Sequence, residues 1–243
     1  LNKIEQFQRN IGEANTWVDT TDATYGEVGD ALNRLRELFV QAANDTNTAD
    51  DRDKMKAEVL QIQEQIRDMA NTQVAGKYLF SGTNTQKPLF IDSGSGAGAR
   101  VMNPNIIAPD GKVMMEVFEG VTFPVNSHGY ELFKGIDETI TRGIEALKAD
   151  NGEAIGGILG DGIGDPANPV DLSSIQSMLL VKRAEIGAKQ QRVDMMDNRL
   201  SNLNINITKQ KSLNEDTDYA KAISDLTIAQ SIHSAGLSIG AKI

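Results

Sequence analysis

The sequence predicts a mainly α fold: a long antiparallel helical rod with an inserted and smaller α+β domain. Two stretches of roughly 40 residues, one near each end, carry apolar residues at alternating spacings of three and four, which is typical of packed helices. A shorter stretch with the same spacing follows the first. The middle of the chain instead contains glycine-rich turns and short strand-like runs.

The longest helical pattern covers residues 171–213, which contain no proline. Arg and Lys lie between and beyond its apolar positions, so the opposite face is expected to be solvated. At 1.5 Å per residue this helix would be roughly 60 Å long, and it therefore needs partner helices of similar length. Its apolar stripe consists of Ile175, Leu179, Ile186, Val193, Met196, Leu200, Leu203 and Ile207.

The partner helices are predicted at the start of the chain, where the same spacing runs without a break through residues 4–42. Thr48 followed by Asp51 three residues later is typical of a helix start. Three stripes joined by short connections predict an antiparallel bundle. The helix that begins near Thr48 carries its stripe at Met55, Val59, Ile62, Ile66 and Met69.

The middle of the chain predicts short strands and one shorter helix. The strand-like runs are residues 77–80, 88–91, 113–118 and 121–125, the last two being separated by a Glu-Gly turn. The helix carries Phe133, Ile136, Ile140, Ile144 and Leu147, and a Gly- and Asp-rich linker at 160–166 follows it. We therefore expect a discontinuous helical rod domain at 1–91 and 171–243, with the inserted α+β domain at 92–170.

Composition and motifs argue against catalysis. The net charge of -10 and pI near 4.7 disfavour nucleic acid as a partner, and without cysteine there is neither a disulfide nor a thiolate metal site. His128 and His233 lie in unlike settings, and neither has a second ligand at metal-binding spacing. We find no nucleophile elbow, no P-loop and no EF-hand. The sequence thus predicts no catalytic, cofactor-binding or metal residue, no cofactor, and no enzyme.

Neither end of the sequence has the signals of a helix end, and no apolar run reaches the length of a membrane span. Leu1 enters an established helical pattern without a capping residue, and Ile243 follows an apolar segment. We therefore expect native sequence to continue at both ends, and we expect no membrane partner.

Two segments resemble bacterial flagellins. Arg183, Ala184, Gly187 and Arg192 fit the pattern R-A-x-[IL]-G-A-x-x-x-R-[LV], which is found in the C-terminal rod helix of that family. Residues 215–230, from the run Glu-Asp-Thr-Asp-Tyr-Ala to Gln230, are similar to the flagellin segment that precedes the C-terminal assembly region. The resemblance covers nearly the whole chain, most loosely at 93–112, and implies a flagellin-like helical bundle.

At one place the chain departs from the flagellin pattern, and there it is similar to the hook-associated junction branch of this family. Flagellins typically have a Phe-Asn-Gly turn after the third helix, whereas residues 76–82 of this chain read G-K-Y-L-F-S-G and are followed by Pro-Leu-Phe at 88–90. Asn126, Gly129 and Phe133 also suit that branch.

The resemblance implies a structural component of the flagellum that joins hook to filament. Its implied partners are the first hook-associated protein and flagellin, with self-association in a ring and a flagellar export chaperone. It also implies an extracellular location after export through the flagellar channel, without a cleaved signal peptide. The alternatives are a flagellin filament subunit or, less favoured, a coiled-coil adaptor or chaperone.

Four residues are candidate assembly contacts: Asp216, Asp218, Tyr219 and Gln230. The first three interrupt the apolar stripe after Leu213, and their oxygens suit hydrogen bonds to a neighbouring subunit. The alternative is a plain helix restart with an Asp as its cap. Gly187 costs its helix about 1 kcal/mol relative to Ala, which predicts the close approach of another backbone; the alternative is that an exposed face of the helix tolerates it.

Overall fold

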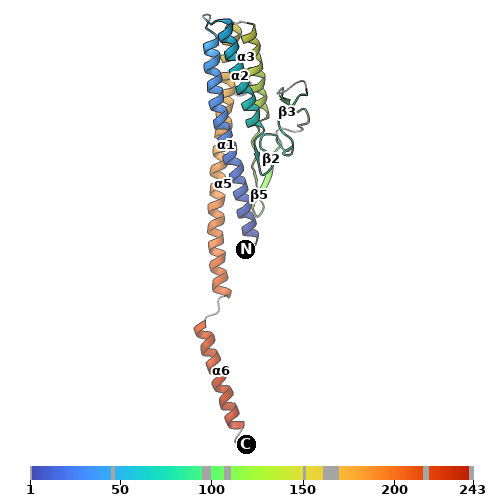
Figure 1. Ribbon diagram of the computed structural model, residues 1–243. Helices are drawn as coiled ribbons and strands as arrows, with labels where there is room; N and C mark the ends of the chain where they lie inside the picture. The colour runs from blue at the N-terminus through green and yellow to red at the C-terminus, as the bar shows by residue number, and fades with distance from the viewer. Residues whose placement is uncertain are drawn as a thin grey trace.

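A computed structural model describes residues 2–44, 47–94, 100–106, 111–149, 152–160, 170–215 and 219–240. The predicted Gly- and Asp-rich linker lies outside these residues except for Gly160. Asp216 and Asp218 also lie outside them. Long helices dominate the molecule, and the strands lie on one side of it (Figure 1). The helices are α1 (Asn2–Ala42), α2 (Ala49–Ala70), α3 (Tyr130–Lys148), α4 (Gly152–Leu159), α5 (Leu172–Glu215) and α6 (Tyr219–Gly240).

Helices α1 and α5 run antiparallel as the spine of the rod, as predicted (Figure 1). Their apolar stripes face each other: Val28 and Leu32 of α1, and Ile175 and Val193 of α5, are fully buried. A series of cross-helix hydrogen bonds fixes the register. They are Gln176 Nε2 to Asn33 Oδ1 at 3.0 Å, Arg183 Nε to Asp22 Oδ1 at 3.2 Å, and Gln190 Nε2 to Asn15 Oδ1 at 3.3 Å.

Helix α2 begins as the sequence predicts. The Thr48 side chain accepts a hydrogen bond from the backbone N–H of Asp51, and the Asp51 carboxylate accepts one from the Thr48 backbone N–H, so the two residues form a capping box. All five residues of the predicted stripe, from Met55 to Met69, are buried. The prediction of an antiparallel helical bundle is therefore confirmed.

The described part of the chain forms three small antiparallel sheets of two strands each, beside the rod. The predicted hairpin at 113–125 is confirmed as β5 (Met114–Phe118) and β6 (Val121–Pro124), with Gly120 at φ 72° in the turn. The runs at 77–80 and 88–91 do not pair with each other. β2 (Lys77–Tyr78) pairs with β1 (Gln73–Val74), and β3 (Phe90–Asp92) pairs with β4 (Arg100–Met102).

Helix α3 packs in the rod rather than beside the strands. It lies against α2, and the Asp137 carboxylate accepts hydrogen bonds from Gln63 Nε2 at 2.9 Å and from Arg67 Nε at 2.8 Å (Figure 1). Phe39 of α1 packs against Gly143, where a β-carbon would overlap the phenyl ring. The boundaries of the proposed inserted domain stay a prediction. The contacts of α3 nevertheless place it in the bundle, because ten residues on its amphipathic face are buried there.

Candidate functional site

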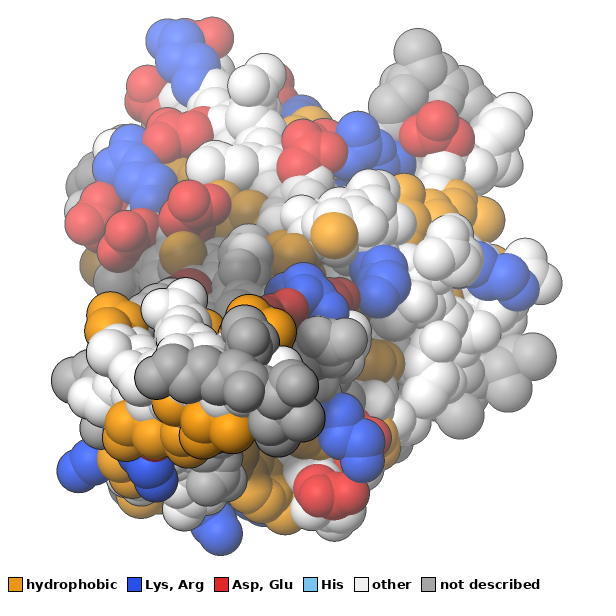
Figure 2. All heavy atoms as spheres, turned by 90° about the horizontal axis from the view of Figure 1, so that it is seen from below, with side chains coloured by type: hydrophobic (Ala, Val, Ile, Leu, Met, Phe, Trp, Pro, Cys, Tyr) orange, Lys and Arg blue, Asp and Glu red, His pale blue; other side chains and the backbone are white. Residues whose placement is uncertain are grey.

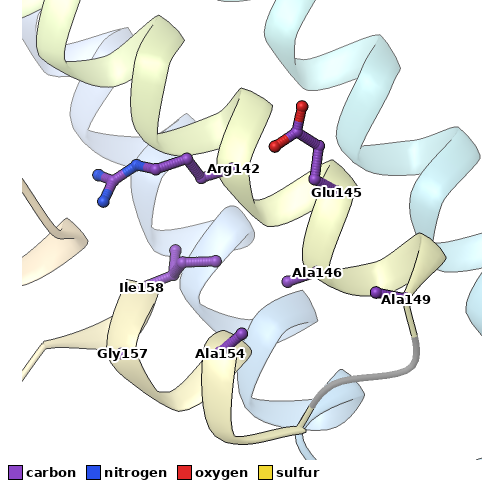
Figure 3. Close-up of a pocket in the computed structure, with 7 residues that line it drawn as sticks. All are labelled: Arg142, Glu145, Ala146, Ala149, Ala154, Gly157 and Ile158. Atoms are coloured by element: carbon purple, nitrogen blue, oxygen red, sulfur yellow. The ribbon is translucent and has the colours of Figure 1, made fainter.

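The described residues show no arrangement suited to catalysis. They contain no group of three His, Cys, Asp or Glu residues that could hold a metal ion. A pocket of about 490 Å³ lies between α3 and α4, lined chiefly by small residues (Figure 3). Arg142 lines this pocket and donates hydrogen bonds to Thr139 Oγ1 and to the Val170 carbonyl. Its side chain thus connects α3 to the segment just before α5. The surfaces of the rod are the better candidate for function.

The two arginines of the α5 motif tie this helix to its neighbours. Arg183 pairs with Asp22 of α1. Arg192 lies over the ring of Phe123 in β6, with its guanidinium carbon 5.5 Å from the ring centroid, within the range of a cation–π contact. Both motif positions thus have roles in holding the rod and the hairpin together. Ala184, between them, is exposed.

The β5–β6 hairpin is fastened to both spine helices. Phe118 packs against Phe7 of α1 with ring centroids 6.0 Å apart, and Arg199 of α5 lies 4.9 Å from the Phe118 centroid. Asn10 Nδ2 donates to the Glu116 carbonyl at 2.6 Å. The hairpin therefore bridges α1 and α5 at a distance from α2 and α3.

The loop before α3 is held by a buried polar cluster. Tyr25 Oη and Ser127 Oγ share a hydrogen bond of 2.8 Å, and Lys189 Nζ donates to the Asn126 carbonyl at 2.5 Å. The Asn126 side chain accepts from the Val113 N–H at 2.9 Å. Burial raises the pKa of Tyr25 strongly, while the Ser127 hydrogen bond opposes this rise. Burial lowers the pKa of Lys189.

Phe80 lies where the strand region meets the rod. Its ring centroid is 5.3 Å from that of Tyr25 and 4.9 Å from that of Phe133, and all three side chains are fully buried. Gly129 packs against Phe80 so closely that an added β-carbon would lie 2.6 Å from Cδ1 of the ring. The junction-type motif at 76–82 and Gly129 thus meet in one aromatic cluster.

We expect the stability of the protein to fall above about pH 10 because of Tyr25. The unfolded chain loses the tyrosine proton near its usual pKa of about 10, whereas the folded protein retains it. The folded state then binds more protons than the unfolded state, so the free energy of unfolding falls with rising pH, by at most about 1.4 kcal/mol per pH unit.

Urea unfolding of the wild type and of Tyr25→Phe between pH 8 and pH 11.5 measures this effect. The wild-type curve should fall more steeply than that of the variant. Lys189 contributes in the opposite direction, since its folded-state pKa is depressed, but it is present in both proteins and cancels in the difference. Parallel curves would contradict the assignment to Tyr25.

The prediction that Gly187 lies against another backbone is wrong within this chain. Gly187 is exposed, and a β-carbon added there would meet nothing within 4 Å. The helical cost of a glycine predicted a packing role, but Gly187 lies on the side of α5 that faces away from α1. The buried neighbour Ile186 is the residue that packs.

Gly187→Ala should raise the free energy of unfolding of the isolated protein by up to about 1 kcal/mol, because alanine restricts the unfolded chain and nothing obstructs its methyl group. Gly143→Ala is the matched control, also in a helix interior. It should lower stability by about 1–3 kcal/mol because its β-carbon overlaps Phe39. Thermal unfolding of both variants tests the pair; destabilisation by Gly187→Ala would restore the packing role.

Large apolar side chains are exposed along the distal part of α5 and on α6. Every side chain described in α6, from Lys221 to Gly240, is exposed. In the end-on view of Figure 2, hydrophobic side chains gather on the end of the molecule nearest the viewer, where α6 lies. The large apolar residues of α6 are Ile223, Leu226, Ile228, Ile232, Leu237 and Ile239, which are at least 57% exposed.

The structure describes two of the four predicted assembly contacts, Tyr219 and Gln230. Gln230 is exposed on α6, and Tyr219 begins that helix. Asp216 and Asp218 lie outside the described residues. Their role as contacts therefore stays a prediction. None of the helices described is long and apolar enough to cross a membrane.

Known proteins match this chain at both of its ends. The bacterial flagellin N-terminal helical region matches residues 1–85, and the bacterial flagellin C-terminal helical region matches residues 174–243. Together the two matches take in more than half of the chain.

Similar whole sequences include flagellar filament proteins. Flagellin A of Vibrio cholerae is 24% identical over 306 residues, covering 98% of this chain and 81% of the relative. The flagellar filament 30.7 kDa core protein of Treponema maltophilum is 24% identical over 243 residues, covering 98% of this chain and 75% of the relative.

Several solved structures share the fold. A putative flagellar hook-associated protein from Vibrio parahaemolyticus has a TM-score of 0.65 at 23% identity, covering 86% of this chain and 90% of its own. Flagellar hook associated protein-3 from Legionella pneumophila has a TM-score of 0.69 at 16% identity, with coverages of 89% and 97%. The flagellar junction protein FlgL from the same organism has a TM-score of 0.65 at 15% identity, with coverages of 86% and 95%.

Proposed function

The chain belongs to the flagellin family, and from this premise we propose that it is the structural component of the bacterial flagellum that joins the hook to the filament. The observation that carries the proposal is the setting of residues 76–82. This junction-type motif places Phe80 between Tyr25 and Phe133 and against Gly129, so it sets how the strand region attaches to the rod. The fold shared with hook-associated and junction proteins supports the same function.

A junction component works by binding and has no need of a catalytic group. Its partners are the first hook-associated protein on one side and flagellin on the other, and copies of the chain associate in a ring. The exposed apolar residues of α6 support an assembly role, because large apolar patches on a surface mark sites of association. Export proceeds through the flagellar channel without a cleaved signal peptide, with a flagellar export chaperone that covers these apolar surfaces.

Localisation separates the proposed function from that of a filament subunit. Immunogold labelling of intact flagella should mark one position, between hook and filament. Deletion of the gene should leave cells with hooks that release flagellin into the medium, and the full-length gene should restore filaments. Labelling along the whole filament would instead assign the chain to the flagellin subunits.

Asp216 and Asp218 are proposed to bind a neighbouring subunit near the start of α6. The full-length double variant Asp216→Ala with Asp218→Ala should fold and be exported but should fail to retain filaments. The exposed residue Glu138 of α3 supplies a control, since Glu138→Ala removes a carboxylate elsewhere on the rod.

A capping role for these two residues gives a different outcome. It predicts a lower melting temperature, by the loss of about 1 kcal/mol per cap, with normal assembly at low temperature. Normal motility together with a lowered melting temperature would rule out the contact role.

A further inference from the structure

Helix α5 carries a second stripe, on the side that faces away from the core. The stripe keeps the spacings of three and four residues typical of a helix–helix contact over about eight turns, although α1 covers the other side of the helix. Charged residues occur throughout 182–199, but none of them falls on this stripe before its last member. We call it the outer stripe; its residues, all exposed, are Leu180, Ala184, Gly187, Gln191, Met195, Asn198, Asn202, Ile205 and Lys209.

Solvation alone does not explain the outer stripe. Leu180 is 67% exposed, Met195 65% and Ile205 66%, so large apolar side chains recur along a face that carries no charge before Lys209. A helix face in contact only with water gains nothing from such side chains, whereas a face that packs on another helix does.

A groove runs between α1 and the outer stripe at Leu180. Its volume is about 310 Å³, and α1 contributes Gly26 and Gly29 to its wall. A β-carbon added at Gly26 would meet nothing within 4 Å, so the wall is recessed where the glycine lies. The groove is therefore open to a large side chain from a neighbouring helix.

Charge on α1 limits what the groove can bind. Residues 10–33 contain no Lys or Arg, so an incoming segment meets carboxylates beside the groove. Arg183 of α5 also lines the groove, but its charge is paired with Asp22, whereas Asp19, Glu27 and Asp30 are exposed. A basic or neutral helix is favoured here, and an acidic one is repelled.

The same chain contains a helix with the complementary properties. Residues 198–213 of α5 contain Arg199, Lys209 and Lys211 and no Asp or Glu. Ile205 on the outer stripe is 66% exposed, and Leu213 is 76% exposed. This segment is basic and exposes two large apolar side chains, as the groove requires.

We propose that the groove between α1 and α5 binds residues 198–213 of a second copy of this chain. Ile205 of one copy packs over Gly26 and Leu180 of the next. Lys209, one turn farther along, comes near the carboxylates of α1, because copies that lie parallel place this segment antiparallel to the neighbour's α1. Donor and acceptor surfaces differ, so the contact is head-to-tail and repeats from copy to copy. The inference rests on the proposed function, for which it supplies the contact between copies.

Cysteine pairs test the contact in the full-length protein, since the chain has no cysteine of its own. Gly26→Cys combined with Ile205→Cys should give dimers and a ladder of higher oligomers when flagella are treated with a short bismaleimide. Each single variant should give none. The control pair is Leu60→Cys with Ile205→Cys, since Leu60 is exposed on α2, outside the groove. It should not cross-link.

Leu180→Asp places a charge on the outer stripe at an exposed position, so the variant should fold, and its thermal unfolding verifies this. It should reduce cross-linked product between the cysteine pair about tenfold or more, because an unpaired carboxylate buried against apolar groups is strongly unfavourable. It should also release filaments. The matched control Leu60→Asp should do neither.

Three results would overturn the inference: no ladder from flagella that assemble normally, a ladder that Leu180→Asp leaves unchanged, or an equal ladder from the control pair Leu60→Cys with Ile205→Cys. The gene deletion distinguishes failure of the proposed function. If the deletion leaves filaments attached, the junction function fails. If the deletion releases filaments but Leu180→Asp retains them with the ladder intact, only the docking contact fails.

Discussion

The antiparallel packing of α1 on α5 is the contact on which the rest of the structure depends. Each helix alone exposes an apolar stripe many turns long, and only a partner of similar length removes it from water. The pairing of the two stripes also determines where the hairpin and the loop before α3 can attach. The β5–β6 hairpin holds both helices through Phe118 and Phe123, and the loop before α3 is bonded to α1 by Tyr25 and to α5 by Lys189. These attachments require the two helices to be in register.

The strands depend on the rod in turn. Two-stranded sheets are marginal on their own in water, and the three here have no common sheet through which to share a core. Their stability comes from side chains that reach the helices. Phe80, inserted between Tyr25 and Phe133, and Phe118, between Phe7 and Arg199, supply that anchorage. Aromatic side chains suit this attachment, because a few large rings on short strands can bury a large apolar area against the helices.

The features that the sequence predicted well are periodic, and those it missed depend on distant residues. The stripes of α1, α2, α3 and α5 repeat over several turns, whereas β1, β4 and α4 are too short to show a period. The role of Arg192 was hidden because Phe123 is far away in the sequence. Gly187 was misread because a glycine's cost to its helix does not reveal which neighbour, if any, approaches it. The assembly contacts stay predictions for Asp216, Asp218, Tyr219 and Gln230, because a contact between two chains cannot be read from the burial within one chain.

The placement of charge on α5 explains how one helix can serve both the fold and a neighbour. Its inner stripe must exclude charge because it is buried, and its outer stripe carries no charge before Lys209 although it is exposed. Arg183, Arg192 and Arg199 occupy the flanks between the stripes, where each finds an acidic or aromatic partner within the same chain. Ionised groups are costly to bury without partners, so a helix with two packing faces must confine them to such flanks. Gly187 and Ala184 on the outer stripe leave room for another helix to approach, and the glycine does so at a cost to its own helix of about 1 kcal/mol.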